Sequence, residues 1–338
     1  MTRVPANQPL LDVRGLRVEF PTRRGTLVAV DDVSFHIDPG EVLGVVGESG
    51  AGKSLTGTAI IGLLEPPGRI AGGEILLDGR RIDNLSYEQM RRIRGREIGA
   101  IFQDPLTSLN PLYTIGRQLI ETIQTHTDLD ATAARKRAVQ LLQDVGIPAA
   151  ERRIEHYPHQ FSGGMRQRVV IALALCANPR LIIADEPTTA LDVSIQAQII
   201  TLLKRLCREH GTAVMLVTHD MGVIAETADR VAVMYAGRIA EIGPVRDVIK
   251  QPKHPYTIGL MGSIPKISRR DERLAQIDGA MPRLNAIPKG CAFNPRCPRV
   301  FGRCLAERPD LIAVERSRVA CWLYDEAGAQ PLKVAGDD

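Results

Sequence analysis

The segment from Gly47 to Ser54 has the residue types and the spacing of a phosphate-binding loop. It reads GESGAGKS and fills the pattern G-x-x-x-x-G-K-[ST] without gaps. Glycines let backbone N–H groups curl around phosphate oxygens, and the helix that follows adds the positive end of its dipole. Lys53 would then reach the β- and γ-phosphates, and the Ser54 hydroxyl would bind Mg²⁺. The candidate nucleotide-binding positions are Gly47, Glu48, Ser49, Gly50, Ala51, Gly52, Lys53, Ser54 and Leu55.

Polar side chains also follow three other apolar runs that are typical of buried strands. In open α/β sheets, ligands bind outside the carboxyl ends of the strands, so these endings can meet the glycine loop at one site. Each ending alone could simply cap a loop, whereas together they favour catalysis. The endings are Gln103 after residues 98–102, Asp185 and Glu186 after residues 181–184, and His219 after residues 213–217, which we expect to form the final strand.

A second glycine-containing stretch, residues 160–168, opens an apolar helix that we expect over residues 169–177. Ser162, Gly163 and Gly164 lead into its N-terminus, which makes a second candidate phosphate cradle. For this segment taken alone, an ordinary helix cap with Ser162 as the capping residue is the favoured interpretation.

The elements before the glycine loop are predicted to form an antiparallel β region. Residues 10–20 end in the alternation Leu16, Val18, Phe20, and residues 33–37 also alternate apolar and polar side chains, as half-buried strands do. Phe20 ends the first of these strands, where it could stack on a base or pack as a core aromatic at a sheet edge. On the residues alone, neither role is preferred.

Helices interrupt the strands that are predicted after the loop. A short strand over residues 73–79 is followed by a helix over 86–94 with Ser86 as its cap. Residues 115–145 are predicted to be helical throughout, with Asp128 and Asp130 as candidate caps and Gly146 as the stop.

Length and charge set limits on the class of protein. The 338 residues suffice for one large or two ordinary domains, and 44% hydrophobic content is normal for a globular chain. The net charge of +4 is too small and too evenly spread to indicate nucleic acid or an anionic membrane as a partner. No run approaches the length of a membrane span, and Met1–Pro9 lacks the apolar region of a secretion signal, so we expect a cytoplasmic chain.

Together these motifs resemble the ATP-binding cassette (ABC) family over residues 10–250. The resemblance identifies GESGAGKS as the Walker A loop, Gln103 as the Q-loop glutamine, LIIADE as Walker B and His219 as the switch histidine. Phe161 to Met165 corresponds to the LSGGQ-type signature, with Met165 in place of the usual glutamine, and Ala190 to Asp192 corresponds to the D-loop. The implied fold is an α/β P-loop NTPase core with an antiparallel β subdomain and a helical subdomain at about residues 106–165.

The resemblance also implies an ATPase mechanism. Asp185, Ser54 and Gln103 would hold Mg²⁺, while Glu186 would polarise the attacking water. Lys53 and His219 would bind or stabilise the phosphates, and Phe20 matches the adenine-stacking aromatic. The signature residues Ser162, Gly163, Gly164 and Met165, with Asp192, would serve ATP on a partner's Walker A loop, which gives a head-to-tail dimer.

The region after residue 250 resembles the small, loop-rich C-terminal extension of ATPase subunits from oligopeptide, dipeptide and nickel importers. The resemblance rests on residues 251–265, on residues 281–284 and on a cysteine-rich segment. It implies two permease subunits, a sister ATPase or a second copy of this chain, and indirectly an extracytoplasmic binding protein, at the cytoplasmic face of the membrane and without nucleic acid. We expect an ATPase that powers peptide import; nickel, glutathione or another small solute, or a soluble ABC ATPase, remain alternatives.

Cys291, Cys297, Cys304 and Cys321 form the cysteine-rich segment, which in a reducing compartment suggests a metal before a disulfide. Their spacing, C-x5-C-x6-C-x16-C, lacks the tight pair of zinc fingers. Four thiolates in a loop-rich segment favour a structural [4Fe–4S] cluster, to which the resemblance also points. Zinc and unliganded thiols stay open as alternatives. The neighbouring Arg296, Arg299 and Arg303 would offset the charge of a cluster or be solvated.

Overall fold

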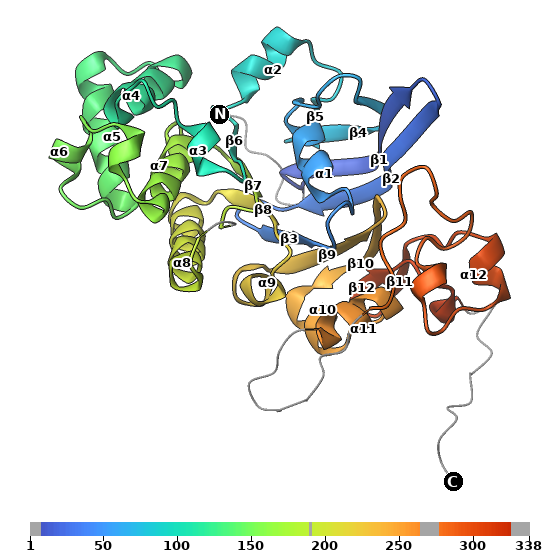
Figure 1. Ribbon diagram of the computed structural model, residues 1–338. Helices are drawn as coiled ribbons and strands as arrows, with labels where there is room; N and C mark the ends of the chain where they lie inside the picture. The colour runs from blue at the N-terminus through green and yellow to red at the C-terminus, as the bar shows by residue number, and fades with distance from the viewer. Residues whose placement is uncertain (1–7, 189–190, 264–276, 326–338) are drawn as a thin grey trace.

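The computed structural model describes residues 8–188, 191–263 and 277–325, which form two β-sheets surrounded by helices (Figure 1). Three sequence predictions fall partly outside these ranges: the N-terminal stretch Met1–Pro9, the D-loop residue Ala190, and the end of the stretch 251–265. Throughout the described ranges, every helix is too short or too polar to cross a membrane.

The smaller sheet is antiparallel, as predicted for the region before the glycine loop, and it also contains two strands that follow the loop. Its strand order is β2-β1-β4-β5. Leu16 and Val18 of the first strand are buried, because alternate side chains of a strand point to the same face. Val13 is buried as well, since the register of β1 shifts between Val13 and Leu16. The members of this sheet are β1 (Leu11–Thr22), β2 (Gly25–Ile37), β4 (Arg69–Leu77) and β5 (Arg80–Arg81).

The larger sheet carries the strands that end at the candidate site. Its order is β11-β12-β10-β9-β3-β8-β7-β6, and the five strands from β9 to β6 are parallel. The parallel strands are β3 (Val42–Val46), β6 (Ile98–Ile101), β7 (Leu181–Asp185), β8 (Ala213–Val217) and β9 (Arg230–Tyr235).

The prediction that residues 213–217 form the final strand was wrong. Four strands follow β8, and three of them continue the sheet in antiparallel fashion beyond β9. The last two, β12 and β11, come from the C-terminal extension. The antiparallel strands are β10 (Arg238–Pro244), β12 (Ser317–Val319) and β11 (Ile312–Val314).

The parallel strands read as continuous apolar runs because both faces of the sheet are covered. In β3, Val42 and Val46 belong to one core cluster, whereas Leu43 and Val45 belong to the other. Helix α1 (Lys53–Ile60) contacts strands of both sheets and lies between them. On the other face, side chains of α8 (Val193–His210) and α9 (Met221–Thr227) share one core cluster with the sheet.

A group of helices lies to one side of the sheets (Figure 1). The single helix predicted over residues 115–145 is in fact two helices, and Asp128 is not a cap. The first ends where the Thr127 hydroxyl donates to the Ile123 carbonyl at 2.7 Å, and Asp130 caps the second by accepting from the Ala133 N–H at 2.8 Å. Gly146 follows the second helix with φ 77°, as predicted for a stop. The group contains α3 (Pro105–Ser108), α4 (Ile115–His126), α5 (Ala131–Asp144), α6 (Ala150–Arg153) and α7 (Gly163–Leu175).

Helix α2 (Tyr87–Ile93) begins at the predicted cap, because the Ser86 hydroxyl accepts from the Gln89 N–H. Short 3-10 helices cover Pro158–Gln160, Asn294–Arg296 and Trp322–Tyr324.

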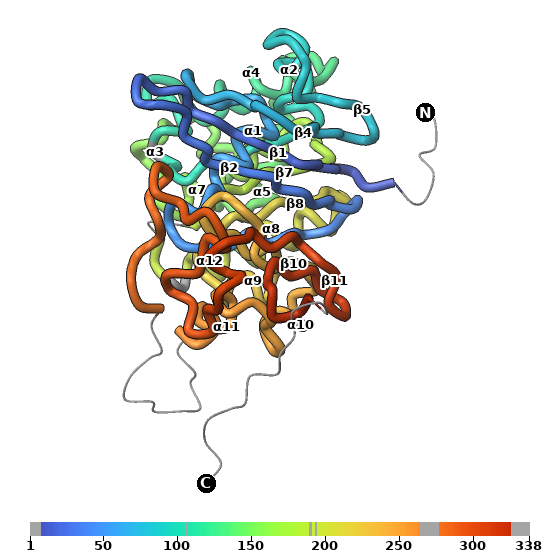
Figure 2. Tube along the Cα trace, turned by 90° about the vertical axis from the view of Figure 1, so that its right-hand side faces the viewer, coloured from blue at the N-terminus to red at the C-terminus, as the bar shows by residue number. Residues whose placement is uncertain are grey.

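The C-terminal extension lies against the β10 side of the larger sheet (Figure 2). Its attachment is polar as well as apolar: the fully buried Glu241 carboxylate accepts from the backbone N–H groups of Lys253 and His254, at 3.1 and 2.9 Å. The helices at this end are α10 (Val245–Lys250), α11 (Pro255–Gly262) and α12 (Gly302–Ala306).

Candidate functional site

A cavity opens at the carboxyl ends of β3, β6, β7 and β8. It brings together polar residues that follow different strands and lie far apart in the sequence, as the sheet topology predicts. The predicted site residues that line it are Ser49, Gly50, Gly52, Lys53, Ser54, Leu55, Gln103, Glu186 and His219.

The glycine loop is shaped by positions that only glycine fills without strain. Gly47 has φ 152°, and a Cβ atom there would lie 2.2 Å from the Met234 carbonyl oxygen. Gly52 precedes α1 in the left-handed region with φ 97°. The loop therefore closes tightly on the end of β9, and the N-terminus of α1 faces the cavity.

Lys53 is buried at the base of the loop, with 6% of its surface exposed. Its ammonium donates to the carbonyl oxygens of Gly47 at 2.8 Å and Glu48 at 3.0 Å. Burial lowers the pKa of Lys53, while the carboxylates of Glu186 and Asp185 oppose that shift. The site thus holds one cation beneath the loop and two acids across from it.

The two groups predicted to hold Mg²⁺ from Walker A and Walker B are adjacent. The Ser54 hydroxyl donates to Oδ1 of Asp185 at 2.9 Å, although 131 residues separate them. Burial raises the pKa of Asp185, and the hydrogen bond from Ser54 partly offsets this. Hydroxyl and carboxylate oxygens are hard ligands that suit Mg²⁺, which keeps several waters and takes few protein ligands.

Glu186 lies close to the other two polar side chains of the strand ends, Gln103 and His219. Its Oε2 atom lies 3.4 Å from Nε2 of Gln103 and 3.5 Å from Nδ1 of His219. The residue adopts a left-handed backbone with φ 46°, a conformation that costs roughly 1–2 kcal/mol for a side chain with a Cβ atom. The Glu186 N–H donates to the Val217 carbonyl of the neighbouring strand at 2.9 Å, which holds it in place.

Phe20 is not among the residues that line the cavity. Its ring packs at the core between the two sheets and against Gly68, where a Cβ atom would lie 2.7 Å from ring Cε1. Adenine stacking by Phe20 therefore stays a prediction.

The signature residues lie elsewhere on the same chain. The Ser162 hydroxyl accepts from the Met165 N–H at 3.4 Å, so the predicted helix cap is confirmed. Gly164 packs against α8, since a Cβ atom there would lie 2.8 Å from Ile195. Asp192 is exposed at the start of α8. Neither the signature nor Asp192 lines the cavity of its own chain.

Sequence reasoning did not place the C-terminal extension at this site. Met281, Pro282, Arg283 and Leu284 line the same cavity as Lys53 and Glu186. No local pattern reveals such a contact, because this segment lies far along the sequence from the glycine loop and from Glu186.

The four cysteines of the extension gather as predicted, around one small cavity next to His254. Burial raises the pKa of Cys291 to about 11 and that of Cys321 to about 12. Within the ranges that the structure covers, however, no three or more His, Cys, Asp or Glu side chains are arranged to hold a metal ion. The thiols are close neighbours without forming a ligand set.

The arginines near the cysteines differ in their partners. Arg303 forms ion pairs with Glu307 and Asp325, so its partners are carboxylates, in addition to any interaction with solvent or the thiols. Arg299 lines the cavity of the cysteines. Arg296 turns the other way and pairs with Glu48 of the glycine loop at 3.0 Å.

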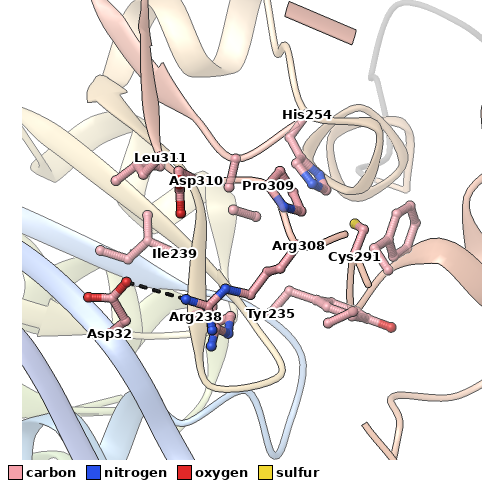
Figure 3. Close-up of a pocket in the computed structure, with 14 residues that line it drawn as sticks. Asp32, Tyr235, Arg238, Ile239, His254, Cys291, Arg308, Pro309, Asp310 and Leu311 are labelled. Carbon is pink, nitrogen blue, oxygen red and sulfur yellow. Dashed lines mark ion pairs between the residues drawn. The ribbon is translucent and has the colours of Figure 1, made fainter. Parts of the chain in front are cut away.

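A further cavity separates the extension from β2 and β10 (Figure 3). Cys291 and His254 lie on one side of it, and Asp32 and Arg308 lie on the other. The Arg308 guanidinium is 3.7 Å from the Asp32 carboxylate. This ion pair ties the extension to the antiparallel sheet.

Known proteins resemble both parts of the chain. Residues 30–189 match the family described as "ABC transporter", and residues 240–304 match "Oligopeptide/dipeptide transporter, C-terminal region". "Oligopeptide transport ATP-binding protein AppD" of Bacillus subtilis (strain 168) is 47% identical over 323 residues, which is 95% of this chain and 98% of the relative. "Dipeptide transport ATP-binding protein DppD" of the same organism is 48% identical, covering 98% of this chain and 99% of the relative.

Solved structures agree with the fold. The dimeric post-hydrolysis state of the ATP-binding cassette MJ0796 bound to ADP and Pi has a TM-score of 0.63 and 31% identity, and the match covers 70% of this chain and 99% of that one. CbiO1 from Clostridium perfringens, described as part of the ABC transporter complex cbiONQ, has a TM-score of 0.63 and 28% identity over 75% of this chain and 96% of its own.

Proposed function

The chain belongs to the ABC transporter ATP-binding proteins that carry an oligopeptide/dipeptide transporter C-terminal region, and we propose that it hydrolyses ATP to power peptide import. One observation carries this function: Lys53, Gln103, Glu186 and His219, from four separate strand ends, line one cavity at the glycine loop. That arrangement supplies a phosphate-binding cation, a base and polar groups to orient water, which phosphoryl transfer requires.

The loop and Lys53 bind and orient the triphosphate. Backbone N–H groups of Gly50 to Ser54 surround phosphate oxygens, and the buried ammonium of Lys53 offsets their charge. Ser54, Asp185 and Gln103 would hold Mg²⁺, which neutralises charge on the β- and γ-phosphate oxygens when bound.

Glu186 acts as the base for water. Its carboxylate accepts a proton from the water whose oxygen bonds to the γ-phosphorus, while the bond from that phosphorus to the bridging oxygen breaks. The products are ADP and inorganic phosphate. Gln103 and His219 both reach the same Glu186 oxygen, so they can orient the base, and His219 is exposed enough to contact the γ-phosphate.

Ser162 to Met165 and Asp192 complete the site of a partner in a head-to-tail dimer. In support, these residues lie outside the cavity of their own chain, and Ser162 leads into the N-terminus of the thirteen-residue helix α7. The partner is a sister ATPase or a second copy of this chain.

The dimer would work on two permease subunits at the cytoplasmic face of the membrane, with an extracytoplasmic binding protein acting indirectly. ATP-driven closure of the two cassettes would be passed to the permeases. We place no nucleic acid among the partners, since the net charge of +4 comes from 43 basic and 39 acidic residues in an even mixture.

The C-terminal cysteines are proposed to hold a [4Fe–4S] cluster with a structural role. Four buried or half-buried thiols around one cavity support it, whereas the lack of a metal-holding group among the described side chains weighs against it. Iron and labile sulfide, measured on full-length protein purified without oxygen, decide the matter. Four of each per chain support a cluster; colourless protein with neither contradicts it, and zinc alone assigns a zinc site.

Transport is tested by reconstituting the chain with its co-purified permeases in proteoliposomes. We expect ATP hydrolysis that rises when the binding protein and a di- or oligopeptide are added, and peptide accumulation that requires ATP. Stimulation by nickel or glutathione but not by peptides would reassign the solute. Hydrolysis that no membrane partner affects would contradict the importer function.

A further inference from the structure

The C-terminal extension holds the outer part of the glycine loop. The backbone N–H of Glu48 donates to the Tyr256 hydroxyl at 2.9 Å, and the Glu48 carboxylate pairs with Arg296 at 3.0 and 3.1 Å. Tyr256 is fully buried in the extension. Both the backbone and the side chain of one loop residue are therefore fixed by residues that lie outside the cassette sequence.

Arg296 also holds the chain that leads into the cavity. Its side chain is 6% exposed, and it donates to the carbonyl oxygens of Ile277 at 3.2 Å and Asp278 at 2.9 Å. A planar guanidinium can form these bonds in several directions at once, which an ammonium cannot match. One buried cation thus joins the glycine loop to the segment just before Met281.

The segment Met281–Leu284 forms a wall of the ATP cavity. Met281 packs against both core clusters, which anchors the segment where the two cores meet. Arg283 is exposed and lines the cavity that also contains Lys53. Within residues 8–188, 191–263 and 277–325, no carboxylate forms an ion pair with Arg283. A guanidinium in this position can bind phosphate oxygens directly.

We propose that the C-terminal extension completes the ATP site of its own chain, with Met281–Leu284 covering the nucleotide and Arg283 binding its phosphates. Arg296 is the positioning residue that holds this wall against the loop. The inference rests on the proposed function, because it assigns new contacts to the same ATP site.

The first experiment compares R283A with K289A in the full-length chain. Lys289 is an exposed cation of the same segment that lines a different cavity, so the two variants lose the same charge. Binding of a fluorescent ATP analogue is measured at protein concentrations that keep the chain monomeric. We expect R283A to bind roughly tenfold more weakly, as for loss of a charged hydrogen bond, and K289A to bind like the wild type.

Comparison of ATP with adenosine identifies the group that Arg283 contacts. R283A should bind ATP much more weakly than the wild type does, whereas the two proteins should bind adenosine equally. Equal affinity of R283A and wild type for ATP overturns the inference. If wild-type protein binds no ATP at all, the proposed function fails instead, so the two failures are distinguishable.

The second experiment tests Arg296 through R296A and R296K. A positioning role predicts a KM for ATP raised roughly tenfold in R296A, partial rescue in R296K, and a smaller change in kcat. Circular dichroism and thermal melting verify that both variants fold. A folded R296A with unchanged KM for ATP contradicts the assignment.

Discussion

Oε2 of Glu186 lies 3.5 Å from Nδ1 of His219, although the two residues follow different strands. The side chain of Glu186 is 17% exposed and that of His219 is 65% exposed. The pair consequently joins a sheltered acid to a group that solvent and a γ-phosphate can reach. We therefore expect substitutions of Glu186 and of His219 to have different effects on the rate of ATP turnover.

Replacing Glu186 by Gln should abolish hydrolysis while ATP still binds, because the amide keeps the size of the side chain but cannot take a proton from water. A loss of about 10²–10⁴-fold in kcat is expected. Phosphate release and filter-bound ATP measure the two effects. Glu209→Gln, on the exposed side of α8, is the control. Turnover of E186Q near the wild-type rate would show that Glu186 is misassigned.

His219→Ala should lower kcat by about tenfold or more, with little change in ATP affinity, since the site residue that His219 contacts is the base Glu186. His219→Gln, which retains a hydrogen-bonding group, should recover part of the rate. Steady-state kinetics measures both variants. If H219A lost ATP affinity as much as kcat, His219 would contribute to ATP binding and not only to the reaction of the γ-phosphate.

Ser162→Arg should prevent ATP-dependent dimerisation without weakening ATP binding to the monomer, because Ser162 lies outside the cavity of its own chain. The substitution is made in the E186Q background, where closed dimers should accumulate. Light scattering after size exclusion gives the mass, with Ser86→Arg at the capped start of α2 as the matched control. Weaker ATP binding by the S162R monomer would indicate that the signature residues contact ATP in the cavity of their own chain.

Glu241→Ala should destabilise the chain by about 2–5 kcal/mol, since it leaves the buried N–H groups of Lys253 and His254 unpaired. Glu315→Ala is the control, because Glu315 pairs with the Lys253 ammonium but is 70% exposed. That pair should contribute less than about 1 kcal/mol. Urea unfolding of both variants provides the comparison, and similar losses would contradict the role of Glu241.

The stability difference between wild type and Glu241→Gln should depend on pH. Burial raises the pKa of Glu241 in the folded chain, so the folded state holds this proton more tightly than the unfolded state. Protonated Glu241 therefore contributes to the free energy of unfolding. This contribution is fully present below the pKa of Glu241 in the unfolded chain and is lost as the pH rises through its pKa in the folded chain. Wild type should therefore lose stability relative to E241Q as the pH rises above about 4.5, the ordinary pKa of a glutamate side chain. A pH-independent difference would contradict the raised pKa.

The cavity residues that come from the glycine loop and the strand ends were predictable because their chemistry is local. GESGAGKS shapes its own loop. Asp185 ends an apolar strand, and Gln103 and His219 each lie two residues past the end of one. Parallel pairing then brings strand ends together without further information. Ser162 and Ser86 were likewise identified as caps from their immediate neighbours.

Two other features were missed, one of them local and the other long-range. The break between α4 and α5 depends on Thr127 and Asp130 bonding to backbone groups instead of continuing a helical run that their neighbours favour. Likewise, the contact of Met281–Leu284 with the cavity arises from the tertiary position of Arg296, which no periodicity encodes.

The pairing of β12 with β10, Glu241 opposite Val319 and Ile242 opposite Arg318, also bears on how short the chain can be. Removing the C-terminal extension would leave β10 as an open edge, with unpaired N–H and C=O groups available to strands of other molecules. Aggregation at that edge would then limit truncation of this protein, together with the loss of Arg283 from the cavity and of Arg296 from its contact with the glycine loop.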